Sequence, residues 1–342
     1  MTTAELGRDE RQVLIPLRLR PPSNRRGNSL TALRGETMGT TWSVKLAGAV
    51  NVDCERLRSG IEQVLAHIVA QMSNWDEASD LSRFNRAGAG NWHTLPADFH
   101  VVLDCALALA EDTGGAYDPT VGPLVELWGF GPGGMKPFLP RENDIETARA
   151  RCGFHKLKLD RKARCVLQPG AVSLDLCGIA KGYAVDRVAS LLHEEGHRDY
   201  LVEIGGELRG EGLKPDGSPW WVALEAPRGC ADAARSETIV ALHGLGVATS
   251  GDYRRYFEHR GVRYAHSIDP HRGYPVANSV LSVTVLHRSC MRADALATAL
   301  MVLGLDAGLK FAAARNIAAF FVLDDESGFQ FRGTPAFAAM AA

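Results

Sequence analysis

The sequence predicts an α+β fold whose sheets are largely antiparallel. Segments with the alternating apolar pattern of strands and segments with the three-to-four-residue repeat of helices follow one another without strict β-α-β alternation. Near the carboxyl end, strand-like segments at 318–323 and 329–332 flank a turn-forming stretch, which is typical of an antiparallel hairpin. The chain has 342 residues, of which 46% are hydrophobic and 23% charged, so it can bury a large core.

Taken in order, the elements begin after a weakly patterned region. Residues 1–36 carry a Pro-Pro pair and several arginines, and we expect them to form a flexible extension. A single domain follows at 37–335, and 336–342 form a short tail. The apolar spacing predicts helices at 54–72, 98–113, 141–152, 292–303 and 307–315. It predicts strands at 41–46, 155–159, 164–167, 173–176, 200–204, 220–224, 238–242, 262–268 and 280–286, besides the closing hairpin.

The composition argues against several classes of partner. A formal net charge of -2 gives no reason to expect nucleic acid or an anionic membrane surface as the main partner. We expect no transmembrane segment, because no apolar run approaches the length of a membrane span. The first residues lack the apolar core of a secretory signal, and the seven scattered cysteines form no Cys-x-x-Cys pair. We therefore expect a cytoplasmic protein, or a periplasmic or membrane-anchored one if the true start differs.

One segment, Ser173–Leu192, changes its pattern abruptly at Gly178-Ile179-Ala180-Lys181-Gly182. The residues before the glycines alternate like a strand, and those after them repeat like a helix. A strand-to-helix turn of this kind can present unpaired backbone amides to an anion such as phosphate. The spacing fits neither a P-loop nor a dinucleotide fingerprint, so a tight turn or close helix packing is the alternative.

The helix predicted at 292–303 carries a second candidate site. Asp294 and Thr298 are four residues apart, so their oxygens project from the same helix face. The surrounding Ala and Leu residues predict burial, and a buried carboxylate needs a partner. Carboxylate, hydroxyl and carbonyl oxygens suit Mg²⁺ better than zinc. The alternative is local capping by Asp294 and a bond from Thr298 to its own backbone.

Further candidates are single residues with two interpretations each. His266, in the strand predicted at 262–268, could accept a proton near neutral pH, or it could be an ordinary sheet histidine. Met38 and Trp75 could face a flat heterocycle, or they could belong to the core. Asp118 and Asp252 each stand beside Pro or Gly, so either could be a turn residue.

Eight motifs in sequence resemble the FAD:protein FMN transferases, the ApbE family, and the resemblance covers residues 38–332. The motifs are Met38–Trp42, Leu81–Asn85, Asp118–Pro123, Gly178–Ala184, Gly205-Gly206, Thr249–Tyr253, Ile268–Pro270 and Ala293–Ala299. Their fixed order is far more specific than any single glycine turn.

This resemblance implies a bilobed, T-fold-like α+β architecture with FAD held between two intertwined lobes. It implies that the carbonyl of Ala180 and the side chains of Asp294 and Thr298 bind Mg²⁺, and that His266 is the base. The implied reaction is attack by a Ser or Thr hydroxyl of an acceptor protein on the FMN-side phosphorus of FAD, which releases AMP and leaves FMN attached through a phosphoester. The implied contacts to the flavin nucleotide are Met38, Trp75, Ala116, Tyr117, Asp118, Tyr183 and Asp252.

The chain departs from the family pattern at three positions. Cys177 stands where a small Gly is common, Ser267 replaces an Ile, and Arg272 replaces a Thr in a turn where it could alter acceptor docking. Two other functions stay open at this point. One is an Mg²⁺-dependent FAD pyrophosphatase that releases FMN and AMP, and the other is a flavin-binding protein without turnover.

Overall fold

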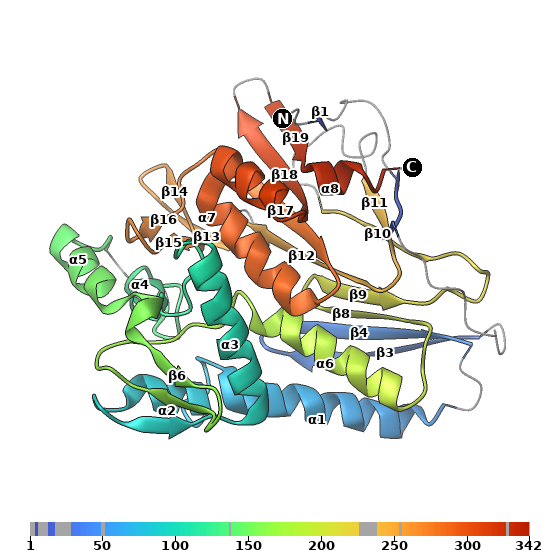
Figure 1. Ribbon diagram of the computed structural model, residues 1–342, viewed down its shortest axis with the longest axis horizontal. Coiled ribbons are helices and arrows are strands. Elements are labelled where there is room, and N and C mark those ends of the chain that lie inside the picture. The colour runs from blue at the N-terminus through green and yellow to red at the C-terminus, as the bar shows by residue number, and fades with distance from the viewer. Residues whose placement is uncertain are drawn as a thin grey trace.

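The computed structural model describes residues 4–5, 13–17, 29–48, 52–136, 138–225, 238–252, 255–325 and 328–341. In this described part, the largest sheet has nine strands in the order β1-β19-β18-β17-β12-β9-β8-β4-β3, and each neighbouring pair is antiparallel (Figure 1). The strands are β1 (Ala4–Glu5), β3 (Leu30–Thr37), β4 (Thr40–Ala47), β8 (Tyr200–Ile204), β9 (Glu207–Glu211), β12 (Leu245–Gly251), β17 (Val280–His287), β18 (Ala318–Asp325) and β19 (Gly328–Gly333). The predicted α+β class with antiparallel sheet is confirmed.

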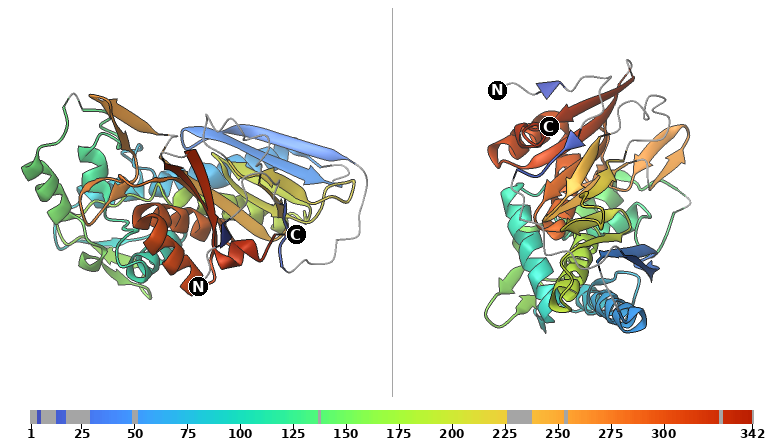
Figure 2. Two further views of the ribbon diagram at one scale, coloured as in Figure 1. Left: turned by 90° about the horizontal axis from the view of Figure 1, so that it is seen from above. Right: turned by 90° about the vertical axis from the view of Figure 1, so that its right-hand side faces the viewer.

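Two layers of helices cover one face of this sheet (Figures 1 and 2). The inner layer is α6 (Ala180–Glu194) and α7 (Cys290–Ala314), which pack on the strands and on each other. The inner layer also includes α1 (Cys54–Met72), which packs on α6 and contacts β3, whereas α3 (Ala97–Asp112) forms the outer layer on α1 and α7. Helix α1 begins where the Asp53 side chain accepts a hydrogen bond from the Arg56 amide at 3.0 Å.

The other face of the sheet is covered by smaller elements. They are β10 (Trp220–Ala223), β11 (Ile239–Leu242), β2 (Val13–Leu14) and α8 (Pro335–Ala338). Trp220 and Phe337 from these elements are buried with Phe320 of β18, while the next residue of β18, Phe321, belongs to the core under the helices. Successive side chains of one strand thus pack into two different cores, because they point to opposite faces of the sheet.

A smaller part with its own core lies at one end of the molecule, at the left of Figure 1. Its elements are α4 (Gly122–Leu127), α5 (Glu142–Arg151), β13 (Tyr256–His259), β14 (Val262–Ala265), β15 (Ile268–Asp269) and β16 (Tyr274–Pro275). The rings of Trp128 and Phe257 both stack on Tyr264. The remaining short elements are α2 (Asp80–Arg86), the 3-10 turn η1 (Phe154–Lys156), β5 (Trp92–Thr94), β6 (Lys158–Asp160) and β7 (Cys165–Leu167).

Most predicted helices are found, but two adjacent ones are joined. The segments predicted at 292–303 and 307–315 form the single helix α7, which is interrupted only in its backbone angles at Gly304 (φ 73°, ψ -175°). Joined, the helix has 25 residues, and an 18-residue window within it has a mean hydropathy of 1.6, which is enough in length and composition to cross a membrane. This apolar character has an explanation within the fold, because α7 packs against β12, β17 and α6 in the main core.

Three predicted strands differ from the structure. The segment predicted at 155–159 begins within the 3-10 turn η1, and strand β6 starts only at Lys158. Segment 173–176 forms a single bridge, from Ser173 to Val121, instead of a strand. The reason is Asn85, whose side chain bonds both the amide and the carbonyl of Leu174, at 2.7 and 3.0 Å, and so replaces a neighbouring strand. The strand predicted at 262–268 ends at Ala265.

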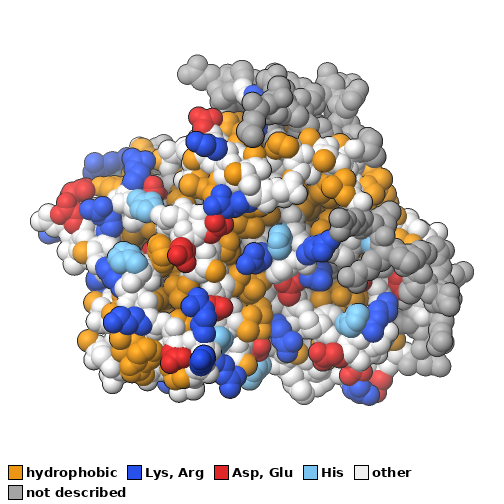
Figure 3. Space-filling view, in the orientation of Figure 1, with side chains coloured by type: hydrophobic (Ala, Val, Ile, Leu, Met, Phe, Trp, Pro, Cys, Tyr) orange, Lys and Arg blue, Asp and Glu red, His pale blue; other side chains and the backbone are white. Residues whose placement is uncertain are grey.

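The structure also bears on the predicted ends of the domain. Within the predicted extension, β1 (Ala4–Glu5) and the first residues of β3, from Leu30, already belong to the main sheet, and Val13–Leu14 pairs with β11. At the other end, Phe337 of α8 is fully buried, so part of the predicted tail belongs to the folded body. Residues 18–28 lie outside the described residues. On the face in Figure 3, basic and acidic side chains lie interspersed, in keeping with the small net charge.

Candidate active site

Helices α6 and α7 approach each other closely where α6 begins. A Cβ atom at Gly182 would lie 2.3 Å from a backbone carbonyl oxygen of α7, and one at Gly178 would lie 2.9 Å from Thr298 Oγ1. A larger side chain at either position would push the two elements apart. The Gly182 amide also donates a hydrogen bond to Asp294 Oδ2 at 2.9 Å. The predicted glycine turn therefore serves close packing, and the residues between its glycines lie against the Asp294 and Thr298 face of α7.

The turn and α7 line a cavity of about 270 Å³, whose other walls come from the smaller part of the molecule and the ends of β9 and β12. Asp294 is only 4% exposed. Burial raises the pKa of its carboxyl group, while the Lys181 charge and the Gly182 amide oppose this shift. Thr298 Oγ1 lies 3.1 Å from the hydroxyl of Ser250. The predicted site residues in this cavity are Trp75, Ala116, Tyr117, Asp118, His266, Asp294 and Thr298.

Two buried polar atoms in this cavity have no hydrogen-bond partner among the described residues. They are the hydroxyl of Tyr117 and Oε2 of Glu207. The other oxygen of Glu207 accepts a hydrogen bond from Lys181 Nζ at 2.5 Å. Burial and the nearby Asp294 raise the pKa of Glu207 to about 7, although Lys181 opposes the shift. Buried polar atoms without partners are rare in folded proteins, so these two indicate a polar guest.

His266 follows β14 and lines the same cavity. Its amide and its Nδ1 lie 3.1 and 3.0 Å from the carbonyl oxygen of Arg255. A carbonyl oxygen only accepts hydrogen bonds, so Nδ1 carries the proton and Nε2 is the basic nitrogen of the neutral ring. The ring packs edge-on against Phe130, with 6.4 Å between the ring centroids. The fold therefore fixes both the orientation and the tautomer of a potential base.

A larger cavity of about 780 Å³ adjoins the first, since both have Trp75, Cys177, Lys181 and Arg255 in their walls. Met38 lines it from the turn between β3 and β4, with a φ of 50° that is uncommon for a residue other than glycine. The Arg255 guanidinium lies 5.8 Å from the centroid of the Trp75 ring. The apolar walls and the volume are typical of a site for a flat organic cofactor.

Three predicted nucleotide contacts are engaged elsewhere. The carboxylate of Asp118 accepts hydrogen bonds from two backbone amides and a threonine hydroxyl, although the residue lines the smaller cavity. Tyr183 lines neither cavity, and its hydroxyl donates to a carboxylate oxygen of α3 at 2.5 Å. Asp252 also lies outside both linings, with Oδ1 3.8 Å from an Arg263 nitrogen.

The predicted magnesium ligands come from two adjoining walls. Asp294 and Thr298 line the smaller cavity, and Ala180 lines the larger one. Among the described residues, no group of three or more His, Cys, Asp and Glu side chains is gathered as if to hold a metal ion. The predicted ligand set differs from such a group, because it consists of one carboxylate, one hydroxyl and one backbone carbonyl. All three donors are oxygens, which suit a hard cation.

The charges of the smaller cavity also fit a cation. Four carboxylates line it, against the two cationic side chains of Lys181 and Arg255. Such an acidic excess repels a diphosphate unless a cation accompanies it. The four carboxylates belong to Asp118, Asp175, Glu207 and Asp294.

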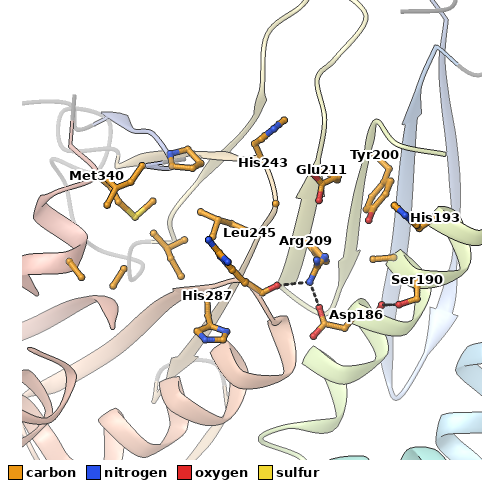
Figure 4. A pocket seen from close by; sticks show the side chains of 18 of the residues that line it. Asp186, Ser190, His193, Tyr200, Arg209, Glu211, His243, Leu245, His287 and Met340 are labelled. Atoms are coloured by element: carbon orange, nitrogen blue, oxygen red, sulfur yellow. Dashed lines mark hydrogen bonds and ion pairs between the residues drawn. The ribbon is translucent and has the colours of Figure 1, made fainter. Parts of the chain in front are cut away.

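A third cavity, of about 1120 Å³, contains none of the predicted site residues (Figure 4). Its side chains include Asp186, Arg209 and His287. Arg209 donates to Asp186 at 2.7 Å, and Asp186 in turn accepts the amides of Cys290 and Met291 at 3.1 Å. Asp186 thereby caps the start of α7, a structural task.

Sequence reasoning missed Glu207 and Arg255 as cavity residues and gave Lys181 no contact in the site. Glu207 directly follows the Gly205-Gly206 motif, and Arg255 lies two residues after the Thr249–Tyr253 motif. Polar or charged residues next to motif glycines were the signal that could have identified both.

Comparisons with known proteins identify the family of this chain. Residues 38–321 match the ApbE family. The FAD:protein FMN transferase of Haemophilus influenzae is 40% identical, over 90% of this chain and 90% of the relative. The protein of the same name from Vibrio cholerae is 41% identical, over 87% of this chain and 89% of the relative.

Solved structures of the same family resemble this chain as well. The flavinyl transferase ApbE of Pseudomonas stutzeri has 42% sequence identity and a TM-score of 0.84, with 91% of this chain and 96% of that chain covered. The flavin transferase ApbE of Vibrio cholerae has 37% identity and a TM-score of 0.82, with 91% and 99% covered. The resemblance inferred from the eight motifs is confirmed, and the chain belongs to the ApbE family.

Proposed function

We propose that this chain transfers FMN from FAD to a Ser or Thr hydroxyl of an acceptor protein, with Mg²⁺ required and AMP released. Its curated relatives carry the name FAD:protein FMN transferase. The observation that carries the proposal is the pair of adjoining cavities. One has apolar walls with Met38 and Trp75, and the other is lined by His266, Asp294 and Thr298 together with polar atoms that have no partner among the described residues.

The larger cavity would hold the flavin nucleotide, and the smaller one the diphosphate. Trp75 stands in both linings and is 52% exposed, so its ring is available to stack on a flat heterocycle. Tyr117 would offer its hydroxyl, which has no partner in the described part of the chain, to the polar end of the substrate. Lys181 and Arg255, present in both linings, would meet the negative charge where the cavities join.

Asp294, Thr298 and the carbonyl of Ala180 would hold the magnesium ion. A bound Mg²⁺ neutralises and aligns a diphosphate so that one phosphoryl group can be transferred. Asp294 is buried and already oriented by the Gly182 amide, so little rearrangement is needed to present its other oxygen. The metal ion would then bind before the substrate, because its charge offsets the repulsion between the acidic lining and the diphosphate.

His266 would remove the proton of the attacking hydroxyl. Its Nδ1 is directed to the Arg255 carbonyl, so the proton arrives at Nε2. A bond forms between the acceptor oxygen and the FMN-side phosphorus, while the bond from that phosphorus to the oxygen bridging to AMP breaks. AMP carries this oxygen away, and the acceptor keeps FMN through a phosphoester.

The test is AMP release from FAD with and without Mg²⁺ and a candidate acceptor, followed by the intact mass of the acceptor. AMP that needs both additions, together with an FMN-sized mass gain, supports the transferase. Free FMN with an unmodified acceptor would favour the pyrophosphatase for that acceptor. Tight FAD binding without AMP under every condition contradicts catalysis and favours a binding protein.

A further inference from the structure

Glu207 is a buried acid to which the proposed reaction assigns no task. It begins β9 directly after Gly205-Gly206, and only 2% of its side chain is exposed. Its Oε1 accepts a hydrogen bond from Lys181 Nζ at 2.5 Å, and its Oε2 has no partner among the described residues. A carboxylate oxygen left unsatisfied in the interior is costly, so Oε2 needs a hydrogen-bond donor that the described residues do not supply.

The charges around Glu207 also indicate that a hydrogen-bond donor is missing. Asp294 lies in the same cavity, and the single ammonium group of Lys181 acts on both carboxylates. One cation does not balance two buried acids, so the pair carries excess negative charge when both carboxyl groups are ionised. Arg255 is the other cationic side chain in this lining, and the two cations still face four carboxylates, so the charge balance favours a bound cation whose waters can donate hydrogen bonds.

We propose that Glu207 completes the magnesium site as an outer ligand, whose Oε2 accepts a hydrogen bond from a water molecule on the bound ion. The inference rests on the Mg²⁺ dependence proposed above. Mg²⁺ keeps several of its waters when few carboxylates bind it, and acceptors for those waters orient and strengthen the site. Lys181 holds the other carboxylate oxygen, so Glu207 is a positioning residue that acts through the metal's water shell.

The test is isothermal titration of Mg²⁺ into the protein, once without FAD and once with FAD but no acceptor. Glu207→Gln keeps the size of the side chain and removes its charge, and Glu207→Ala removes the side chain. Both should fold, because Lys181 is 31% exposed and water can solvate it without its partner. We expect Mg²⁺ affinity to fall about tenfold or more in both variants, as for other outer ligands of metal sites. The matched control is Glu211→Gln on the same strand, which lines the third cavity and should leave affinity unchanged.

The outcomes separate the two proposals. Wild-type binding of Mg²⁺ that persists within twofold in both Glu207 variants overturns the role of Glu207 and leaves the metal site standing. Wild-type protein that binds no Mg²⁺ in either state overturns both. Loss of affinity in the Glu207 variants and also in the Glu211 control would make the effect one of net charge alone, and would likewise overturn the assignment.

Discussion

Replacing Gly182 by alanine should force α6 away from α7 and weaken both the fold and the active site. The new Cβ atom would lie 2.3 Å from the carbonyl oxygen of Cys290 and 2.8 Å from the Cβ of Asp294. Ordinary contacts begin at 3.4 Å, and the first of these atoms is backbone, so the helices must separate by roughly 1 Å.

The magnitude follows from two terms that act together. Overpacking a tight interior contact costs about 1–3 kcal/mol. The separation also stretches the hydrogen bond from the Gly182 amide to Asp294, which is 2.9 Å long and ends on a charged acceptor. Losing such a bond costs about 1.5–3 kcal/mol, and the better helix propensity of alanine returns up to about 1 kcal/mol. We expect a net loss of about 2–5 kcal/mol in the free energy of unfolding.

Urea unfolding measures this loss, and Gly60→Ala in α1 is the matched control. A Cβ at Gly60 meets only Leu191 Cδ2, at 3.5 Å, so this variant should be unchanged or more stable by up to about 1 kcal/mol. The same samples titrated with Mg²⁺ should show weaker binding in Gly182→Ala alone. A loss below about 1 kcal/mol in Gly182→Ala would refute the claim that close packing of α6 on α7 requires glycine here.

Three further predictions test other parts of the structure. His266→Asn should lower AMP release at least about 100-fold while FAD affinity changes little, since a general base contributes about that much; near-normal turnover would contradict this role. Trp75→Ala should weaken FAD binding by about 1–3 kcal/mol in a flavin fluorescence titration, whereas Trp92→Ala, similarly exposed at 54% but outside both cavities, should not; equal effects would argue against stacking. Burial lowers the pKa of His287, so the folded state binds fewer protons than the unfolded chain near pH 6. The stability that the neutral ring contributes at pH 7 is therefore lost as the pH falls below about 6.5. The stability advantage of wild type over His287→Asn in urea unfolding should therefore shrink from pH 7 to pH 5, and a constant difference would count against a buried neutral ring.

The elements that could be predicted from the sequence are those whose local signals agree with their tertiary role. Helix α1 spans the predicted residues because Asp53 caps it and Leu57, Ile61 and Leu65 repeat along one buried face. Strands β9 and β12 escaped prediction because their sequences, ELRGE and LGVATSG, hold few residues that favour strands. Their pairing in the middle of the nine-stranded sheet stabilises them instead.

The site was predictable to the extent that motifs mark it. Asp294, Thr298 and His266 meet in one cavity although each, alone, had an ordinary structural interpretation. The glycine pair before Glu207 marks its position, but its burial and its ion pair with Lys181 follow only from the packing of α6 against β9. The same limit applies to Tyr183, whose hydroxyl turns toward α3 for reasons that only the packing of α6 on its neighbours provides.

The hydrogen bond between Gly182 and Asp294 joins residues 112 positions apart, and Asp294 lines the smaller cavity. Such a cavity does not exist in the unfolded chain, so any ligand bound there is also a ligand of the native state alone. At a concentration one hundred times its Kd, such a ligand adds about 2.7 kcal/mol to the free energy of unfolding. The supply of FAD and metal in the cell would then govern how much of this protein stays folded, as well as how fast it works.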